Sequence, residues 1–229
     1  ETEHEVRAVL DRVDPSLLDS CPKTLIAANG MDAFTQLLES YVSLRASPFT
    51  DALASSGMQA FRDGFWQAWT AGDPLAQQGY QKIAYASLCS GITLAQCGLG
   101  SVHGLASPLG AFFPIPHGVV CGTLVAAATR VNIDALRARD PAGIALRKYA
   151  EAGILLSGRM FTSEVAAQDG LIDLLEQWTA RLSLPRLSEF GMADADVERV
   201  VANSRGGSMQ TNPIRLDDDE LANVLRTRL

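Results

Sequence analysis

Two of the three histidines and one aspartate are the residues best suited to hold a metal ion. His103 and His117 flank an apolar stretch that is rich in glycine and proline. Three prolines in this stretch and just before His117 prevent one continuous helix, so the two histidines belong to different elements. They can meet only if the chain folds back on itself.

Asp32 and Gln36 are the second pair with metal-binding potential. They lie four residues apart near the start of a predicted helix, so their side chains share one face of it. A carboxylate, an amide oxygen and two imidazoles would form a mixed oxygen and nitrogen site suited to Zn²⁺ or Fe²⁺. Spacing alone leaves a structural interpretation open, because a carboxylate near a helix start is commonly a cap and a histidine in an apolar stretch is commonly a hydrogen-bonded core residue.

The elements that must position these residues all have helical periodicity. Phe34, Leu37, Leu38 and Tyr41 follow the i, i+3, i+4, i+7 pattern of one helix face, in a helix expected from Asn29 onward. A single turn or loop is expected at 14–20, and Thr50 is expected to cap a second helix after Ser47-Pro48. Further helices are expected at 75–97, which we expect to be central and largely buried, and at 119–131, 144–156, 164–182, 193–202 and 217–229. The sequence therefore predicts an all-α domain built as a helical bundle.

A near match to a dinucleotide-binding turn begins at Gly98. The run Gly98-Leu99-Gly100-Ser101-Val102-His103 has histidine where the last glycine of G-x-G-x-x-G belongs, and it follows a helix instead of a strand. We interpret these glycines as residues that let a helix end and the chain turn.

Composition excludes several classes of protein. The 229 residues are 47% hydrophobic and 20% charged, which is typical of a globular chain, and the net charge of −7 argues against nucleic acid as a partner. The four cysteines form no C-x-x-C pair, which favours a reducing, cytoplasmic setting. The sequence has no clean apolar span of about 20 residues, so we expect no membrane helix. The first residue is not Met, which predicts that the chain is a piece of a longer protein.

Two long motifs carry a family resemblance. The first is Gly30-Met31-Asp32-Ala33-Phe34-Thr35-Gln36-Leu37-Leu38-Glu39-Ser40-Tyr41-Val42-Ser43 with the following 46–54, and the second is 98–111 continuing to Pro116-His117-Gly118. Together with the closing Asn212-Pro213, they resemble the iron-containing alcohol dehydrogenase family from about Val13 onward.

The resemblance implies a helical, dehydroquinate synthase-like C-terminal domain over residues 14–229. Residues 1–13 would be a linker or the end of an N-terminal nucleotide-binding domain that this chain lacks. The family's metal ligands correspond to Asp32, Gln36, His103 and His117. Gln36 departs from the family pattern, which has histidine there, and an amide oxygen is a weaker ligand than imidazole.

The resemblance also implies residues beside the metal ligands. Ser107 stands where many members carry a histidine that relays a proton, so we expect its hydroxyl to pass a proton through water. Ser107 and Gly104 are expected to border the substrate or the nicotinamide, and Phe112 and Phe113 either line the cleft or pack in the core.

The implied activity is an alcohol dehydrogenase or aldehyde reductase in which Fe²⁺ or Zn²⁺ polarises the substrate oxygen and hydride passes to or from NAD(P). The nicotinamide would be bound by the absent domain, the partner would be a small alcohol or aldehyde, and a homodimer is the expected assembly. Two alternatives remain open: a non-catalytic helical binding or assembly module, and a relative of glycerol dehydrogenase or dehydroquinate synthase.

Overall fold

The computed structural model describes residues 14–70 and 72–229, and all regular structure in those ranges is helical. The helices are α2 (Lys23–Val42), α3 (Pro48–Trp69), α4 (Ala76–Cys97), α5 (Ser101–Phe112), α6 (His117–Arg139), α7 (Ile144–Ser157), α8 (Glu164–Arg181), α9 (Val197–Ala202), α10 (Gly207–Gln210) and α11 (Asp218–Thr227), with 3-10 turns at Pro15–Leu18, Leu187–Phe190 and Asp194–Asp196. The predicted all-α class is confirmed. The linker predicted at 1–13 lies outside the described residues.

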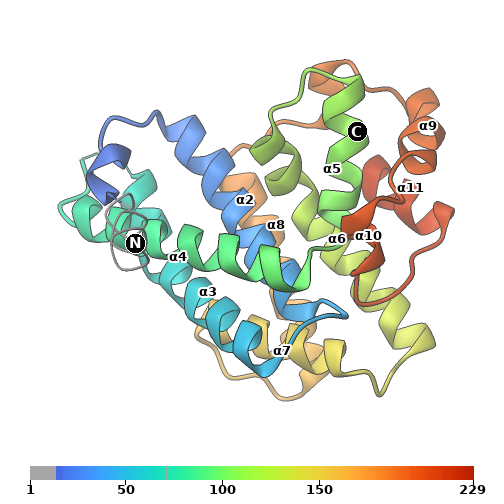
Figure 1. Ribbon diagram of the computed structural model, residues 1–229, viewed down its shortest axis with the longest axis horizontal. Coiled ribbons are helices and arrows are strands. Elements are labelled where there is room, and N and C mark those ends of the chain that lie inside the picture. Colours follow the sequence, from blue (N-terminus) through green and yellow to red (C-terminus); the bar gives the residue numbers. More distant parts are fainter. Residues whose placement is uncertain (1–13, 71) are drawn as a thin grey trace, which may run out of the picture.

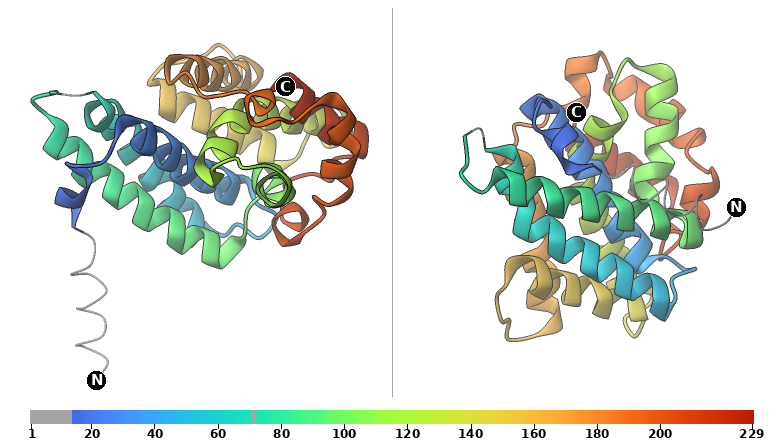
Figure 2. Two further views of the ribbon diagram at one scale, coloured as in Figure 1. Left: turned by 90° about the horizontal axis from the view of Figure 1, so that it is seen from above. Right: turned by 60° about the vertical axis from the view of Figure 1, so that its left-hand side comes forward.

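Two hydrophobic clusters form the interior, and α6 belongs to both. The first cluster joins α2, α3, α4, α7 and α8 around stacked aromatic rings, with Phe61 and Phe65 centroids 4.4 Å apart. The second joins α5, α9 and α11. Helix α6 gives Ile133 to the first cluster and Leu124 to the second, and it lies between the two groups of helices (Figure 1, Figure 2).

The position of α6 explains its composition. Among the described helices, α6 is the one that by itself has the length and hydropathy of a membrane span. Helices α4 and α5 would form a second candidate only if this pair, which is bent by 96°, were a single span. In α6, 83% of the apolar stretch is buried inside the protein. Because both clusters pack on α6, most of its circumference is apolar, and the charged Arg130 and Asp134 lie on its exposed strip.

Helix α2 begins six residues before the predicted start at Asn29, at Lys23. Asp32 therefore lies well inside the helix, and the interpretation of Asp32 as a residue of the helix start is wrong. The chain stays helical through Gly30 because packing stabilises it there. An added Cβ on Gly30 would come within 2.5 Å of the Phe65 ring, so the glycine allows α3 to approach closely.

Three other expectations about the helices need correction. Ser47 is the N-cap of α3, and Thr50 completes its capping box three residues later. Helix α4 has nearly the predicted bounds but is not largely buried, because Tyr85 and Ile92 are 43% and 38% exposed. The central buried helix is α6, which runs from His117 to Arg139 and so exceeds the predicted 119–131 at both ends.

The remaining helical predictions hold within a few residues. Helices α7, α8 and α11 fall in the expected ranges, whereas the expected helix at 193–202 is a 3-10 turn followed by the short α9. The short segment at 14–20 is a 3-10 turn capped by Asp14, as predicted. His103 and His117 lie on α5 and α6, so their assignment to different elements is also confirmed.

The turn between α4 and α5 contains two glycines, each required for a different structural reason. Gly98 has φ of +69°, a left-handed conformation that favours glycine. Gly100 has no room for a side chain, since an added Cβ would lie 2.8 Å from Asn212 Oδ1 and 2.9 Å from Glu39 Oε1. The interpretation of these glycines as a helix end and turn is confirmed.

Helix α5 is capped by residues from elsewhere in the chain. Its own N-cap is Gly100, which has no side chain, and the Glu39 carboxylate of α2 accepts hydrogen bonds from the Gly100 N–H at 3.0 Å and the Val102 N–H at 2.7 Å. Asn212 Oδ1 accepts the Ser101 N–H at 2.9 Å. The amides that would bind a phosphate at this turn are therefore held by a carboxylate, which would repel one.

Gly100→Ala should destabilise the protein, because the new methyl group would push against Glu39 and Asn212. We expect the free energy of unfolding to fall by about 1–3 kcal/mol, measured by urea unfolding followed by circular dichroism. Gly91→Ala is the matched control: Gly91 lies inside α4 with nothing within 4 Å of an added Cβ. The control should gain about 0.5–1 kcal/mol from helix propensity. Equal stability of the two variants would contradict the tight approach at Gly100.

Candidate metal centre

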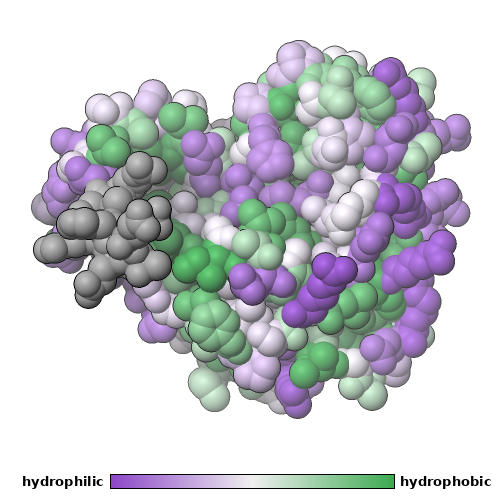
Figure 3. Space-filling view, viewed as in Figure 1, coloured by the Kyte–Doolittle hydropathy of each residue, from purple (hydrophilic) through white to green (hydrophobic). Residues whose placement is uncertain are grey.

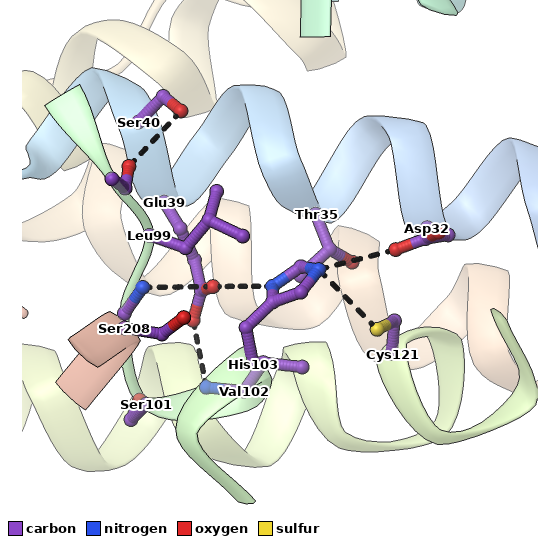
Figure 4. A network of polar contacts seen from close by, with 12 residues as sticks. Asp32, Thr35, Glu39, Ser40, Leu99, Ser101, Val102, His103, Cys121 and Ser208 are labelled. Carbon is purple, nitrogen blue, oxygen red and sulfur yellow. Dashed lines mark hydrogen bonds and ion pairs between the residues drawn. The ribbon is translucent and has the colours of Figure 1, made fainter. Parts of the chain in front are cut away.

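Four side chains from three helices converge at one point. Asp32 comes from α2, His103 from α5, and His117 and Cys121 from α6, and their potential ligand atoms all lie within 4.8 Å of one another. Figure 4 shows His103 between Glu39 and Asp32 along α2, with the Cys121 sulfur facing the same end of the imidazole ring as Asp32. The sequence-predicted Asp32, His103 and His117 are thus brought together.

Four of the six separations among these atoms fit a four-coordinate divalent ion, and the other two are at most 4.8 Å. Asp32 Oδ1 lies 3.2 Å from His103 Nε2 and 3.6 Å from His117 Nε2. Cys121 Sγ lies 3.6 Å from each of the same two nitrogens. Bonds of about 2.0–2.3 Å around a tetrahedral ion put neighbouring ligand atoms about 3.3–3.7 Å apart. A carboxylate, two imidazoles and a thiol at these separations match the donor types and the size of a Zn²⁺ or Fe²⁺ site.

The centre is buried on one side and open on the other. The side chain of His103 is 6% exposed, that of Asp32 20% and that of His117 55%. The surface is hollowed between the part that holds α2 and α4 and the part that holds α5 (Figure 3). The exposed His117 side chain is the side of the centre that solvent and small molecules reach most easily.

Glu39 sets the orientation of His103. One of its carboxylate oxygens lies 2.7 Å from His103 Nδ1. Because Nδ1 is held by this carboxylate, Nε2 points toward Asp32 and Cys121. A carboxylate behind a metal-binding histidine fixes the tautomer and ring orientation and makes the histidine a stronger ligand.

The surroundings of the centre favour the protonated, positively charged form of His103. Burial opposes protonation of His103, but hydrogen bonds with Asp32, Cys121 and Glu39 outweigh it and raise the pKa of His103 to about 12. Burial works against ionisation of Asp32, yet the hydrogen bond and charge of His103 leave the pKa of Asp32 below its usual value. Burial raises the pKa of the Cys121 thiol to about 12. A divalent cation bound here would take the place of the proton on Nε2.

The other predicted site residues have different surroundings. Gln36 lies one turn beyond Asp32 on α2 and is partly buried, and its role as a ligand stays a prediction. Ser107 lies one turn beyond His103 on α5 and is exposed. Gly104 is buried where an added Cβ would come 2.6 Å from Met209 Cε, so packing accounts for the glycine. The roles of Ser107 and Gly104 toward substrate or nicotinamide stay predictions.

Phe112 and Phe113 belong to the packing of the second cluster. Both rings are partly buried against it. The Arg199 guanidinium lies over the Phe112 ring, 3.8 Å from its centroid. Of the two interpretations of this pair, core packing is the one that these contacts favour.

Cys121 is the residue of the centre that sequence reasoning missed. It follows His117 by four residues, which puts the two side chains on one face of a helix. The predicted helix starts at residue 119, which leaves His117 outside it and does not pair His117 with Cys121. The spacing H-x-x-x-C at a helix start is the signal that could have revealed it.

Known proteins share this fold and sequence. Residues 26–229 match the family described as Fe-containing alcohol dehydrogenase family, C-terminal. The 1,3-propanediol dehydrogenase of Klebsiella pneumoniae is 31% identical over 217 residues, covering 93% of this chain and 53% of that protein. Alcohol dehydrogenase 4 of Schizosaccharomyces pombe is 29% identical over 239 residues, covering 100% of this chain and 53% of that protein.

A solved structure supports the same assignment. The crystal structure of a 1,3-propanediol oxidoreductase superposes with a TM-score of 0.84 at 30% identity, over 94% of this chain and 55% of that one. The chain spans about half the length of the relatives that it matches. With the two sequence motifs, the helical fold and the family match all in agreement, the chain belongs to the iron-containing alcohol dehydrogenase family, as its C-terminal domain.

Proposed function

We propose that this chain is the metal-holding half of a nicotinamide-dependent alcohol dehydrogenase or aldehyde reductase. The observation that carries the proposal is the convergence of Asp32, His103 and His117 from three helices, with ligand atoms at separations suited to a divalent ion. The relatives named as alcohol and propanediol dehydrogenases support the reaction class.

The residues of the centre contribute in different ways to holding the ion. Asp32 supplies negative charge, His103 and His117 supply neutral nitrogen ligands, and Glu39 holds His103 in place through Nδ1. When bound, Fe²⁺ or Zn²⁺ supplies Lewis-acid polarisation of the substrate oxygen, which favours hydride exchange with NAD(P). The nicotinamide itself would be held by a nucleotide-binding domain outside residues 1–229.

The substrate and the proton are proposed to use the open side of the centre. His117 is the most exposed of the three predicted ligands that converge, so a small alcohol or aldehyde would enter beside it. Ser107 is exposed one turn beyond His103, where its hydroxyl would pass a proton to or from water. Gly104 lies next to His103, where the proposal puts it along the border of the nicotinamide.

This function is tested by removing the metal from the full-length protein with a chelator and then adding Fe²⁺ or Zn²⁺ back. We expect the stripped protein to be inactive and the Fe²⁺- or Zn²⁺-loaded protein to oxidise primary alcohols such as 1,3-propanediol, followed by nicotinamide absorbance. Because Lewis-acid polarisation depends on the ion, activity should track its stoichiometry. A protein that binds the ion but transfers no hydride would support the non-catalytic binding module instead.

Metal binding should also stabilise the fold. At a free ion concentration about 100 times the Kd, linkage predicts a gain of about 2.7 kcal/mol in the free energy of unfolding, measurable by urea unfolding with and without Zn²⁺. His103→Ala should abolish the gain while leaving helicity largely intact. Cys97→Ser, which changes a buried thiol that donates to Thr93 O, is the control and should keep the gain. An undiminished gain in His103→Ala would place the ion elsewhere.

Glu39→Gln should weaken metal binding without removing a ligand. The neutral amide no longer supplies the charge behind His103 Nδ1, and the loss of such a supporting residue typically costs 10–100-fold in affinity. Calorimetric titration with Zn²⁺ measures the change. Glu151→Gln is the matched control, because Glu151 accepts a 2.6 Å hydrogen bond from Tyr41 outside the cluster. An unchanged affinity in Glu39→Gln would mean that the carboxylate only caps α5.

A further inference from the structure

We propose that the thiolate of Cys121 is a protein ligand of this metal centre and takes the place that the family resemblance assigns to Gln36. The inference rests on the proposed metal site and adds a sulfur donor to it. It predicts a centre of one oxygen, two nitrogens and one sulfur.

The geometry around Cys121 is that of a ligand position. Its sulfur lies 3.6 Å from His103 Nε2 and 3.6 Å from His117 Nε2, the two nitrogens that face Asp32. These distances equal the spacing expected between sulfur and nitrogen ligands of one tetrahedral ion, about 3.6 Å. The sulfur therefore has the spacing of a fourth ligand from both imidazole nitrogens, and it lies within 4.8 Å of the Asp32 carboxylate.

The position of Cys121 in α6 makes this arrangement rigid. Cys121 is fully buried and one turn beyond His117, so one helix presents both side chains to the centre. Gly122, the next residue, packs with no space for a side chain against Met31 of α2, where an added Cβ would lie 2.9 Å from Met31 Cβ. This close approach holds α6 against the helix that carries Asp32.

A second buried thiol shows what a purely structural cysteine does in this protein. Cys97 donates to backbone carbonyls, at 3.0 Å from Thr93 O and 3.5 Å from Ser40 O. Cys121 instead faces two imidazole nitrogens. The two cysteines are equally buried, so burial does not explain the difference in their partners.

The chemistry of the donor favours Cys121 over Gln36. A thiolate is a charged, soft ligand that suits Zn²⁺, Co²⁺ and Fe²⁺, whereas a neutral amide oxygen suits harder ions such as Mg²⁺ and Mn²⁺. On binding, the S–H bond breaks, a metal–sulfur bond forms, and the proton leaves to solvent with no change of oxidation state. The sulfur also compensates for the histidine that the family pattern has at position 36.

Cobalt substitution of the full chain tests the proposal. Co²⁺ is added to chelator-stripped protein, bound metal is counted by elemental analysis, and the near-ultraviolet spectrum is read for thiolate-to-cobalt charge transfer. We expect one bound ion with the charge-transfer band. Cys121→Ser should lose the band and at least about tenfold in affinity, since even the loss of a residue that only supports a ligand typically costs 10–100-fold. Cys97→Ser and Gln36→Ala should keep the band.

The outcomes separate this inference from the proposed function. If cobalt binds at one equivalent without the band, and His103→Ala abolishes binding, then the metal site stands and the sulfur ligand is refuted. If the wild-type chain retains no cobalt, the proposed metal centre fails and this inference fails with it. The wild-type spectrum decides the question even if Cys121→Ser does not fold.

Discussion

One buried carboxylate connects the fold of this protein to its candidate centre. Glu39 accepts hydrogen bonds from two backbone amides at the start of α5 and pairs with His103 Nδ1. A buried charge is costly unless it is fully hydrogen-bonded, and here three donors satisfy it. The same group therefore caps a helix whose own N-cap residue has no side chain, and it orients the His103 imidazole toward Asp32. Without it, two amides at the start of α5 and His103 Nδ1 would lose the acceptor that holds them.

The centre lies where the two hydrophobic clusters meet. Helix α2, which carries Asp32, belongs to the first cluster, α5 with His103 belongs to the second, and α6 belongs to both. Ligands on separate helices hold their spacing only if the helices are packed tightly, and the buried, apolar α6 provides that packing. The functional groups are thus supported by packed helices and not by loops, which favours a precise site.

The family assignment and the structure emphasise different residues of the centre. The family motif points to Gln36, which lies one turn beyond Asp32, whereas the convergence of ligand atoms points to Cys121. Both residues are four positions from a predicted ligand on the same helix. They differ in donor chemistry: a sulfur ligand from Cys121 and an amide oxygen from Gln36 favour different metal ions.

The sequence by itself determined the helical class, most helix bounds and the placement of His103 and His117 on separate elements, because periodicity, caps and prolines act locally. It also predicted Asp32 as a metal ligand. The tertiary structure showed that α2 begins at Lys23 and continues through Gly30, which packs closely against Phe65. The roles of Glu39 and Cys121 likewise arise from contacts between helices distant in the chain. No local pattern encodes such distances, because they depend on how whole helices pack.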